Sequence, residues 1–326
     1  MKNIAKTIIT SVAFLSAATS MAADLSLANF MSPNHPYEAG VFKPFAESVK
    51  TATAGEVTVT IYSGGELGTG PKEQYNRAVD GVADFAFALP GYTASHFPTT
   101  LLTELPGIIS EERGTETLYN NLDYFADEFR RVKLAGIWTN AENVLYTSKK
   151  AIRQLEDLKG LKIRAPSKNA GLIIESWGAT PVSMPVTEIY NAMQTGVIDG
   201  AFIDGTASDS FKLGEVAQYI TQGMNSSISV FAILMNRHSF ADLSQEQQQA
   251  VLKSGREAAF AANRIQLANA HKALETFGST PGKELITLSP EAKAAFDTAS
   301  ESVIEAIMSK ENDSDAVRFI LALQGK

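Results

Sequence analysis

The chain alternates between segments with the pattern of a β-strand and segments with the pattern of a helix. Residues 24–30 and 56–62 place apolar and polar residues in alternation, and residues 83–89 form a third apolar run of strand length. Helices are expected between these segments, over 36–53 and 71–81. This βαβαβ order predicts a mainly parallel sheet that is covered by helices.

The same order returns in the middle of the chain. Strands and helices are expected in turn over 161–165, 167–179, 181–184, 186–196 and 197–203. Short connections between such elements favour right-handed crossovers, which bring successive strands into the sheet in parallel. The middle of the chain therefore predicts a second α/β unit.

The last third of the chain contains one very long helical segment. Residues 228–236 precede it and are apolar at nearly every position, which is typical of a strand buried on both faces. Residues 244–277 form the long segment, with Ser244 as a suitable N-cap and Gly278 as its expected end. At about 1.5 Å per residue this helix reaches about 50 Å, so we expect it to bridge both units. Two shorter helices are expected near 290–309 and 313–324.

The first 22 residues have the pattern of a secretory signal peptide. Lys2 and Lys6 precede a short apolar run, and Ser20-Met21-Ala22 is a small-x-small cleavage pattern. No later apolar stretch reaches the roughly 18 residues of a membrane span. The chain has no cysteine, so it cannot carry the lipid of a bacterial lipoprotein. We therefore expect an exported protein of the periplasm without direct membrane anchoring.

Composition and motifs exclude several classes of function. The net charge is −8 and charges of both signs are mixed along the chain, so the basic face that nucleic acid requires is not expected. The four histidines are scattered without a metal-ligand spacing, and no thiol is available. Residues 63–72 lack the Gly-Lys-Ser/Thr of a phosphate loop, and no GxSxG motif occurs. We therefore expect no metal, no cofactor and no catalytic residue.

Two motifs in the second unit carry a family resemblance. "LKGLKIRAP" at 158–166 is followed at close spacing by "PVTEIYNAMQTGVIDG" at 185–200. With the long helix and the "GGELGTG" segment at 64–70, this order resembles the solute-binding subunit of TRAP transporters, the tripartite ATP-independent periplasmic carriers. The resemblance implies a two-domain periplasmic solute-binding fold in which a ligand is enclosed at a hinge. The expected domains are 24–141 plus 229–268 and 142–228 plus 269–326.

Arg164 is the leading candidate for ligand binding. The resemblance implies that the arginine of the KIRAP strand holds the carboxylate of the ligand. The position agrees with this, because Pro166 ends the strand just after Arg164 and ligands of parallel sheets bind outside the carboxyl ends of strands. A guanidinium also matches a carboxylate through two parallel hydrogen bonds. We expect the helix that Ser167 begins to aim its free N–H groups at the same anion.

Departures from the family pattern narrow the class of ligand. Members that bind sialic acid carry a second arginine within the stretch that reads "NVLY" at 143–146 here, and this chain has the apolar Leu89, Phe202 and Ile203 where they have polar residues. A site built to bond hydroxyl groups leaves its polar groups unpaired when the hydroxyls are absent, so apolar replacements indicate a less hydroxylated ligand. A small or aromatic organic monocarboxylate is expected, and a sulfonate stays open because the same fork accepts it.

Six further residues are candidates for lining the cleft. The aromatic ones are Tyr92, Phe202 and Trp177, each of which could instead be a core residue. The polar ones are Asp204, which could meet an amine or hydroxyl, together with Asn140 and His35.

The predicted function is that of a periplasmic receptor. It would close two domains over an organic acid and deliver it to the membrane subunits of a TRAP carrier, as the resemblance implies. An ABC-type receptor is an alternative, and the membrane partner would distinguish the two. A periplasmic enzyme acting on an organic acid is a second alternative, which would require a nucleophile or an acid–base pair in the cleft.

Overall fold

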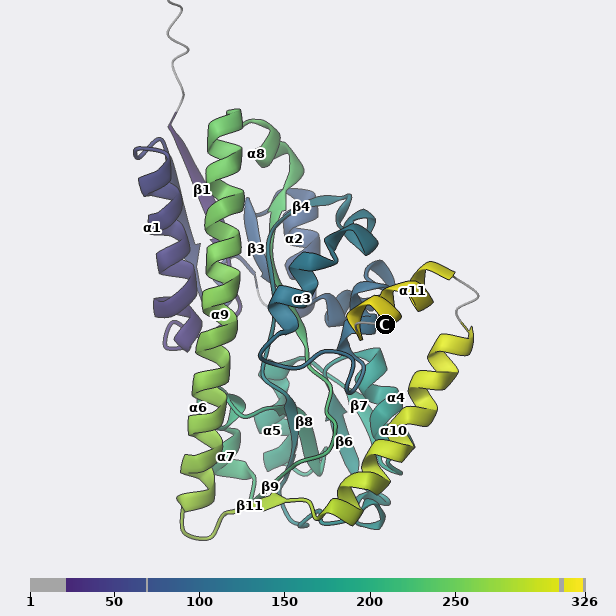
Figure 1. Ribbon diagram of the computed structural model, residues 1–326. Helices are drawn as coiled ribbons and strands as arrows, with labels where there is room; N and C mark the ends of the chain where they lie inside the picture. The colour runs from purple at the N-terminus through teal and green to yellow at the C-terminus, as the bar shows by residue number, and fades with distance from the viewer. Residues whose placement is uncertain (1–21, 69, 311–313, 325–326) are drawn as a thin grey trace, which may run out of the picture.

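Two lobes, each built on one β-sheet, stand one above the other, and a single long helix runs along both (Figure 1). This is a computed structural model, and it describes residues 22–68, 70–310 and 314–324. We refer to the lobe that holds the N-terminal strand as the first lobe and to the other as the second lobe. The expected signal peptide, residues 1–22, lies outside the described residues except for its last position.

The sheet of the first lobe has five strands. Their spatial order is β2 (Val57–Tyr62), β1 (Ala23–Ala28), β3 (Phe85–Ala88), β10 (Val230–Asn236) and β4 (Val132–Thr139). β1 is parallel to both β2 and β3, whereas β10 is antiparallel to both β3 and β4. Every residue of β10 is buried, as its continuous apolar run predicts for a strand with neighbours on both sides.

The sheet of the second lobe has six strands. Their spatial order is β11 (Glu284–Thr287), β9 (Tyr219–Gln222), β5 (Asn143–Thr147), β8 (Gly200–Asp204), β6 (Lys162–Ala165) and β7 (Thr180–Ser183). Here β5 is antiparallel to β8 and β9, and the other ladders are parallel. In each sheet, therefore, one strand runs against all the others. The expected mainly parallel α/β architecture is confirmed.

The reversed strands mark the places where the chain passes between the lobes. β5 follows β4 of the first lobe after only three residues, and β10 follows β9 of the second lobe. A strand that arrives from the other lobe enters its sheet from the interlobe side. It therefore runs opposite to strands that a helical crossover brings back to the starting end.

Helices cover both sheets. In the first lobe these are α1 (Lys43–Ala52), α2 (Gln74–Asp80), α3 (Gly114–Asn120) and α8 (Arg237–Ala241), with short helical turns η1 (Glu38–Phe42), η3 (Pro90–His96) and η4 (Thr100–Glu104). The second lobe carries α4 (Lys168–Ser176), α5 (Ile189–Gln194), α6 (Ala207–Ser210) and α7 (Leu213–Val216), and α10 (Pro290–Lys310) packs on α4.

The long helix is α9 (Gln245–Ser279), and it contacts β4 and α1 in the first lobe and α6 and β11 in the second. It begins as expected: Ser244 and Gln247 form a capping box. The expected stop at Gly278 is wrong, because the helix runs on to Ser279. A Cβ on Gly278 would lie 3.0 Å from the Leu285 side chain, so this glycine serves close packing against β11.

Glycines let α9 approach both lobes closely. A Cβ on Gly255 of α9 would lie 2.2 Å from the carbonyl oxygen of Ala135 in β4. In the second lobe, a Cβ on Gly205 would lie 2.6 Å from the carbonyl oxygen of Ala270 in α9. No real Cβ tolerates such distances, so both contacts depend on the missing side chain. The helix is thus fixed to each lobe by backbone packing.

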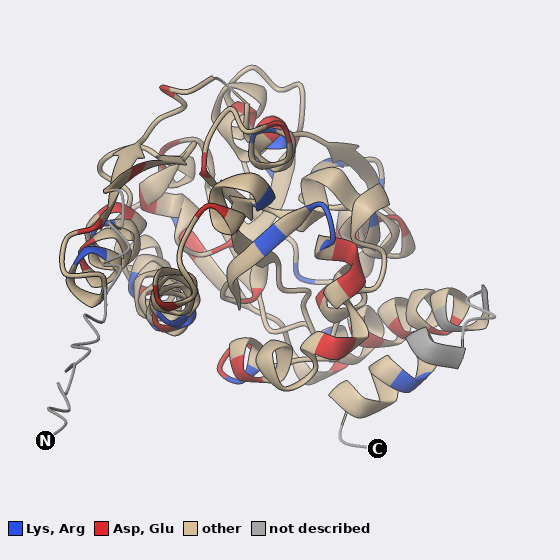
Figure 2. Cartoon of the chain, turned by 90° about the horizontal axis from the view of Figure 1, so that it is seen from above, with Lys and Arg blue, Asp and Glu red and all other residues tan. Residues whose placement is uncertain are grey.

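The C-terminal helix α11 (Ser314–Leu323) lies beside the first lobe. The ring of Phe319 is 5.1 Å from that of Tyr124 and 5.7 Å from that of Phe125. It therefore contacts the first lobe although its residues were assigned to the second domain, and the domain boundaries themselves stay a prediction. Among the described residues, none of the helices combines the length and the hydrophobicity that a membrane span requires. Acidic and basic residues are interspersed along the outer helices in Figure 2.

Candidate ligand-binding site

A cavity lies between the lobes, where the strand ends of the two sheets face each other. It contains about 430 Å³ of space that protein atoms do not occupy, including open solvent at its mouth. Parallel strands of both sheets point their carboxyl ends at it: Tyr92 lies shortly after β3, Asn140 directly after β4, and Asp204 ends β8. The reversed strands present their amino ends, so Asn143 and Ser229 also line the cavity.

Arg164 of β6 is buried, with 1% of its surface exposed, and its guanidinium lines this cavity. Its Nε donates to the carbonyl oxygen of Met184 at 3.0 Å and its Nη1 to that of Phe202 at 3.3 Å. No ion pair in the described part of the chain includes Arg164, so its partners are neutral. Burial lowers the pKa of this guanidinium. A buried cation without a carboxylate partner is costly, which makes the position suited to an anion from outside.

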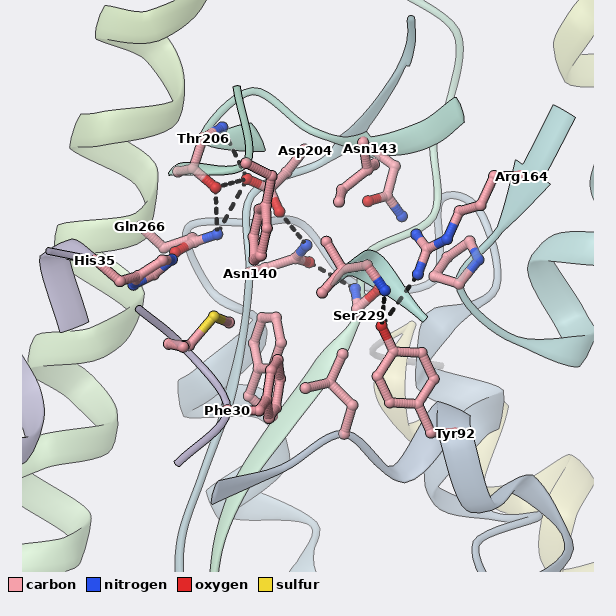
Figure 3. Close-up of a pocket in the computed structure, with 17 residues that line it drawn as sticks. Phe30, His35, Tyr92, Asn140, Asn143, Arg164, Asp204, Thr206, Ser229 and Gln266 are labelled. Carbon is pink, nitrogen blue, oxygen red and sulfur yellow. Dashed lines mark hydrogen bonds between the residues drawn. The ribbon is translucent and has the colours of Figure 1, made fainter. Parts of the chain in front are cut away.

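Tyr92 of η3 connects the first lobe to Arg164. Its phenolic oxygen accepts from Nη2 of Arg164 at 3.1 Å and from the backbone N–H of Val186 at 3.0 Å (Figure 3). Both donors belong to the second lobe. A phenol has two acceptor lone pairs and one proton, so the proton of Tyr92 is still available to an acceptor in the cavity. The arginine and the tyrosine thus form one end of the site.

Asp204 organises the opposite side of the cavity. Its Oδ2 accepts from Asn140 of the first lobe at 2.9 Å, and its Oδ1 accepts from the side chain of Gln266 in α9 at 3.0 Å. The backbone N–H and the hydroxyl of Thr206 donate to Oδ1 as well, at 3.0 and 2.5 Å. Burial raises the pKa of Asp204, and these hydrogen bonds oppose the rise. The carboxylate therefore joins the two lobes and α9.

His35 lies beside this cluster and is neutral. Burial lowers its pKa to about 4. Its Nδ1 accepts from the backbone N–H of Tyr37 at 3.1 Å, which places the ring proton on Nε2. The imidazole can therefore donate one hydrogen bond from Nε2, and in Figure 3 it lies across the cavity from Arg164 and Tyr92.

A second buried carboxyl, Glu104 of η4, lies just outside the cavity. It accepts from the backbone N–H of Val230 at 3.1 Å and is hydrogen-bonded to the hydroxyl of Ser167 in the second lobe. Burial raises the pKa of Glu104 to about 7. Ser167 begins α4 as expected, accepting from the N–H of Ala170. The hydroxyl of Ser167 thus meets the protein's own Glu104, and the expectation that the free N–H groups of this helix start face the ligand stays a prediction.

A family model matches residues 27–311, and its description is bacterial extracellular solute-binding protein, family 7. The chain belongs to this family. The resemblance to TRAP solute-binding subunits is thereby confirmed. A solute-binding protein of Albidiferax ferrireducens is 30% identical over 220 residues, which cover 65% of this chain and 64% of that relative.

Solved structures of family members have the same fold. A TRAP solute-binding protein from a marine metagenome, specific for aromatic acid ligands and crystallised with 3-hydroxybenzoate, has a TM-score of 0.88 and 27% identity, covering 94% of this chain and 98% of that one. A member from Bordetella bronchiseptica with both enantiomers of mandelate bound has a TM-score of 0.81 and 26% identity, covering 93% and 99%. The chain therefore resembles proteins that hold small aromatic acids.

Of the seven candidate residues in this family 7 chain, five line the cavity: Arg164, Tyr92, Asp204, Asn140 and His35. The structure places the other two, Phe202 and Trp177, in the core of the second lobe. Their rings meet edge to face at 5.2 Å, and the indole N–H donates to Ser300 at 2.9 Å. Neighbouring residues of a strand point to opposite faces, so Ile203 lines the cavity while Phe202 points away from it.

Several residues of the site had no signal in the sequence pattern. Asn143 belongs to a stretch that reads as apolar, and Gln266 lies in the middle of α9. The apolar walls include Phe30 and Phe231, and Phe30 stacks on Phe87 of the core with 5.2 Å between ring centroids. The positions of Asn143, Phe30 and Phe231 could have been found only from the rule that the ends of strands of both directions meet at the cavity.

Proposed function

We propose that this protein is the periplasmic receptor of a TRAP carrier and that it captures a small organic monocarboxylate, aromatic in its preferred ligands. The observation that carries the proposal is Arg164: a buried guanidinium with neutral protein partners at one end of a cavity with apolar walls. The solved relatives that hold 3-hydroxybenzoate and mandelate support this class of ligand.

The carboxylate would lie between Arg164 and Tyr92. The guanidinium has five N–H groups, and three of them have acceptors among the described residues. The remaining two can hold one carboxylate oxygen or both, and the phenolic proton of Tyr92 supplies a further donor. Such charge-assisted hydrogen bonds are about twice as strong as neutral ones.

The apolar body of the acid would contact the walls of the cavity. Phe30 and Phe231 come from the first lobe, and Ile203 and Val186 come from the second. Rings that are buried against aromatic side chains gain about 0.5–1.5 kcal/mol per pair beyond the area buried. A hydroxyl-rich sugar acid would bring many polar groups against these walls, which disfavours it.

Closure would couple binding to a change in shape. Tyr92 and Asn140 of the first lobe bond Arg164 and Asp204 of the second directly, so these contacts exist only while the lobes are together. Closing over the acid removes water, and the attraction between carboxylate and guanidinium strengthens as the local dielectric falls. An acid that binds the closed form better shifts the population toward it.

The closed receptor would then deliver its acid to the membrane subunits of the carrier. Family membership and the signal-like N-terminal pattern support a periplasmic location and a carrier partner. A receptor role is the simplest account of the cavity, because its described residues Arg164 and Tyr92 offer hydrogen-bond donors that would hold the acid.

Thermal-shift and calorimetric titrations with benzoate, 3-hydroxybenzoate and mandelate test the proposal. An acid that binds the native state raises the melting temperature of the wild type. Arg164→Ala is expected to abolish this rise, and Arg164→Lys to reduce it strongly, because a point charge cannot reproduce the fork.

Arg153→Ala is the matched control, since Arg153 pairs with Glu284 on the surface at 2.7 Å and lies outside the cavity. Micromolar affinity in Arg164→Ala would contradict the anchor. Conversion of the acid during incubation, detected by chromatography, would favour an enzyme.

A further inference from the structure

Among the described residues that line the cavity, Asn143 has the one side-chain oxygen that is buried without any hydrogen-bond partner. Asn143 begins β5 and is 1% exposed. Its backbone N–H donates to the carbonyl oxygen of Ser227 at 3.0 Å, and its Nδ2 donates to the hydroxyl of Ser227 at 3.1 Å. Its Oδ1 is buried without a hydrogen-bond partner in the described part of the chain.

The neighbouring amide shows what a purely structural asparagine does here. Asn140 donates to Asp204 through Nδ2 and accepts from the backbone N–H of Ser229 through Oδ1 at 2.6 Å. Both ends of that amide are used by the protein. A buried acceptor that lacks a partner is rare in native proteins, so the contrast with Asn143 points to a partner that arrives with the ligand.

The register of the strands places Asn143 close to the anchor for the carboxylate. On β8, Asn143 lies opposite Asp204, while the guanidinium of Arg164 bonds the carbonyl oxygen of Phe202, two residues earlier on the same strand. Asp204 and Phe202 are about 7 Å apart along β8, and the side chains of Asn143 and Arg164, on the strands to either side, both line the cavity. Figure 3 shows the Asn143 amide and the Arg164 guanidinium on the same side of the cavity.

We propose that Asn143 recognises a hydroxyl group on the carbon next to the carboxylate, so that the ligand is a 2-hydroxy acid; this rests on the proposed function. The hydroxyl would donate to Oδ1 while Arg164 and Tyr92 hold the carboxylate. A hydroxyl is both donor and acceptor, so it also satisfies the amide in the opposite orientation, in which NH₂ faces the cavity. A ligand with a single hydroxyl, placed at Asn143, is compatible with the apolar walls that form the rest of the cavity.

Paired acids that differ only in this hydroxyl test the proposal. Phenylacetate and the better-bound enantiomer of mandelate are titrated by calorimetry into the wild type and into Asn143→Leu. We expect the wild type to prefer mandelate by about tenfold or more. Asn143→Leu should bring the ratio close to one by weakening mandelate and not phenylacetate.

Two further variants separate recognition from folding. Ser227→Ala removes the hydroxyl that accepts from Nδ2 of Asn143 but leaves the Asn143 amide at the cavity. This variant should therefore keep the preference for mandelate. Asn143→Asp keeps the size of the side chain and places a carboxylate beside Arg164, so it should weaken both acids at least tenfold by competing for the guanidinium. Unchanged affinity in Asn143→Asp overturns the proposed proximity.

The outcomes distinguish this inference from the proposed function. Equal binding of the two acids by the wild type overturns the 2-hydroxy acid and leaves the receptor for organic acids in place. A preference for mandelate that survives in Asn143→Leu also overturns the role of Asn143. Binding of neither acid overturns both proposals.

Discussion

The phenolic oxygen of Tyr92 holds two donors of the second lobe at once, and removing it by Tyr92→Phe should weaken ligand binding strongly. In the closed form the oxygen accepts from Arg164 and from the backbone N–H of Val186. In an open form both donors can bond water, so the loss falls on the closed, ligand-bearing state. The melting temperature of the ligand-free protein should change much less than the affinity.

The size of the effect follows from what each donor loses. A bound carboxylate can take over the N–H of Arg164, but Val186 is buried and its N–H has no substitute, which costs about 1–3 kcal/mol. The acid also loses the proton that Tyr92 can donate, worth roughly 1.5 kcal/mol for a bond to a charged group. Together these amount to about 3 kcal/mol, or roughly a hundredfold rise in Kd.

Calorimetric titration of the wild type and Tyr92→Phe with mandelate and benzoate measures this difference. Tyr119→Phe is the matched control, because Tyr119 also accepts a backbone N–H, that of Ile137 at 3.4 Å, but lies outside the cavity. Stopped-flow release of the acid should show that most of the loss is a faster dissociation. A Kd within threefold of the wild type would refute the bridging role.

Three other predictions concern stability. Burial lowers the pKa of His35 to about 4, against 6.5 for a free side chain, so the unfolded chain binds more protons between these pH values. The free energy of unfolding should therefore fall by about 3 kcal/mol as the pH drops through that range. His35→Asn, which keeps an acceptor, should remove this pH dependence in urea titrations. Glu104 has the opposite sign, because its pKa rises to about 7 from 4.5 and the folded state holds its proton longer; Glu104→Gln should raise Tm at pH 8 and leave it unchanged at pH 4. Gly205→Ala should cost about 1–3 kcal/mol through the contact with Ala270, whereas Gly171→Ala, with 3.7 Å of clearance inside α4, should be neutral or stabilising; equal Tm values for the two glycine variants would contradict the packing argument.

Local patterns in the sequence were sufficient for the two α/β units and the long helix, but not for the strands β4, β5, β9 and β11. Strand and helix periods are properties of short segments, and Ser244 capped α9 as its pattern predicts. The pairing of β4 with β10 joins segments almost a hundred residues apart, and no local pattern encodes such a partner. The reversal of β5 and β10 therefore had to come from the three-dimensional structure.

The candidate site was predictable for residues at or just after the end of a strand, such as Arg164, Tyr92 and Asn140, and less so for aromatic residues inside elements. Arg164 lies in a specific motif at a strand end, and the structure has it at the cavity. Phe202 and Trp177 were chosen as aromatic residues, and a continuous apolar run does not tell which face of the sheet each residue occupies. Asn143 was missed because it begins a strand whose next three residues are buried and hydrophobic.

A polar residue that lines the cavity does not necessarily contact the ligand. Asp204 lines the cavity, yet four donors of the protein already occupy its oxygens, so its carboxylate joins the lobes more readily than it meets a ligand. Arg164 and Asn143 lie equally deep but keep unused hydrogen-bonding capacity. A protein leaves such groups unpaired only at a cost in free energy. The unused donors of Arg164 and the unused acceptor of Asn143 therefore describe the ligand better than the full set of lining residues does. They indicate an anion site beside a hydroxyl site.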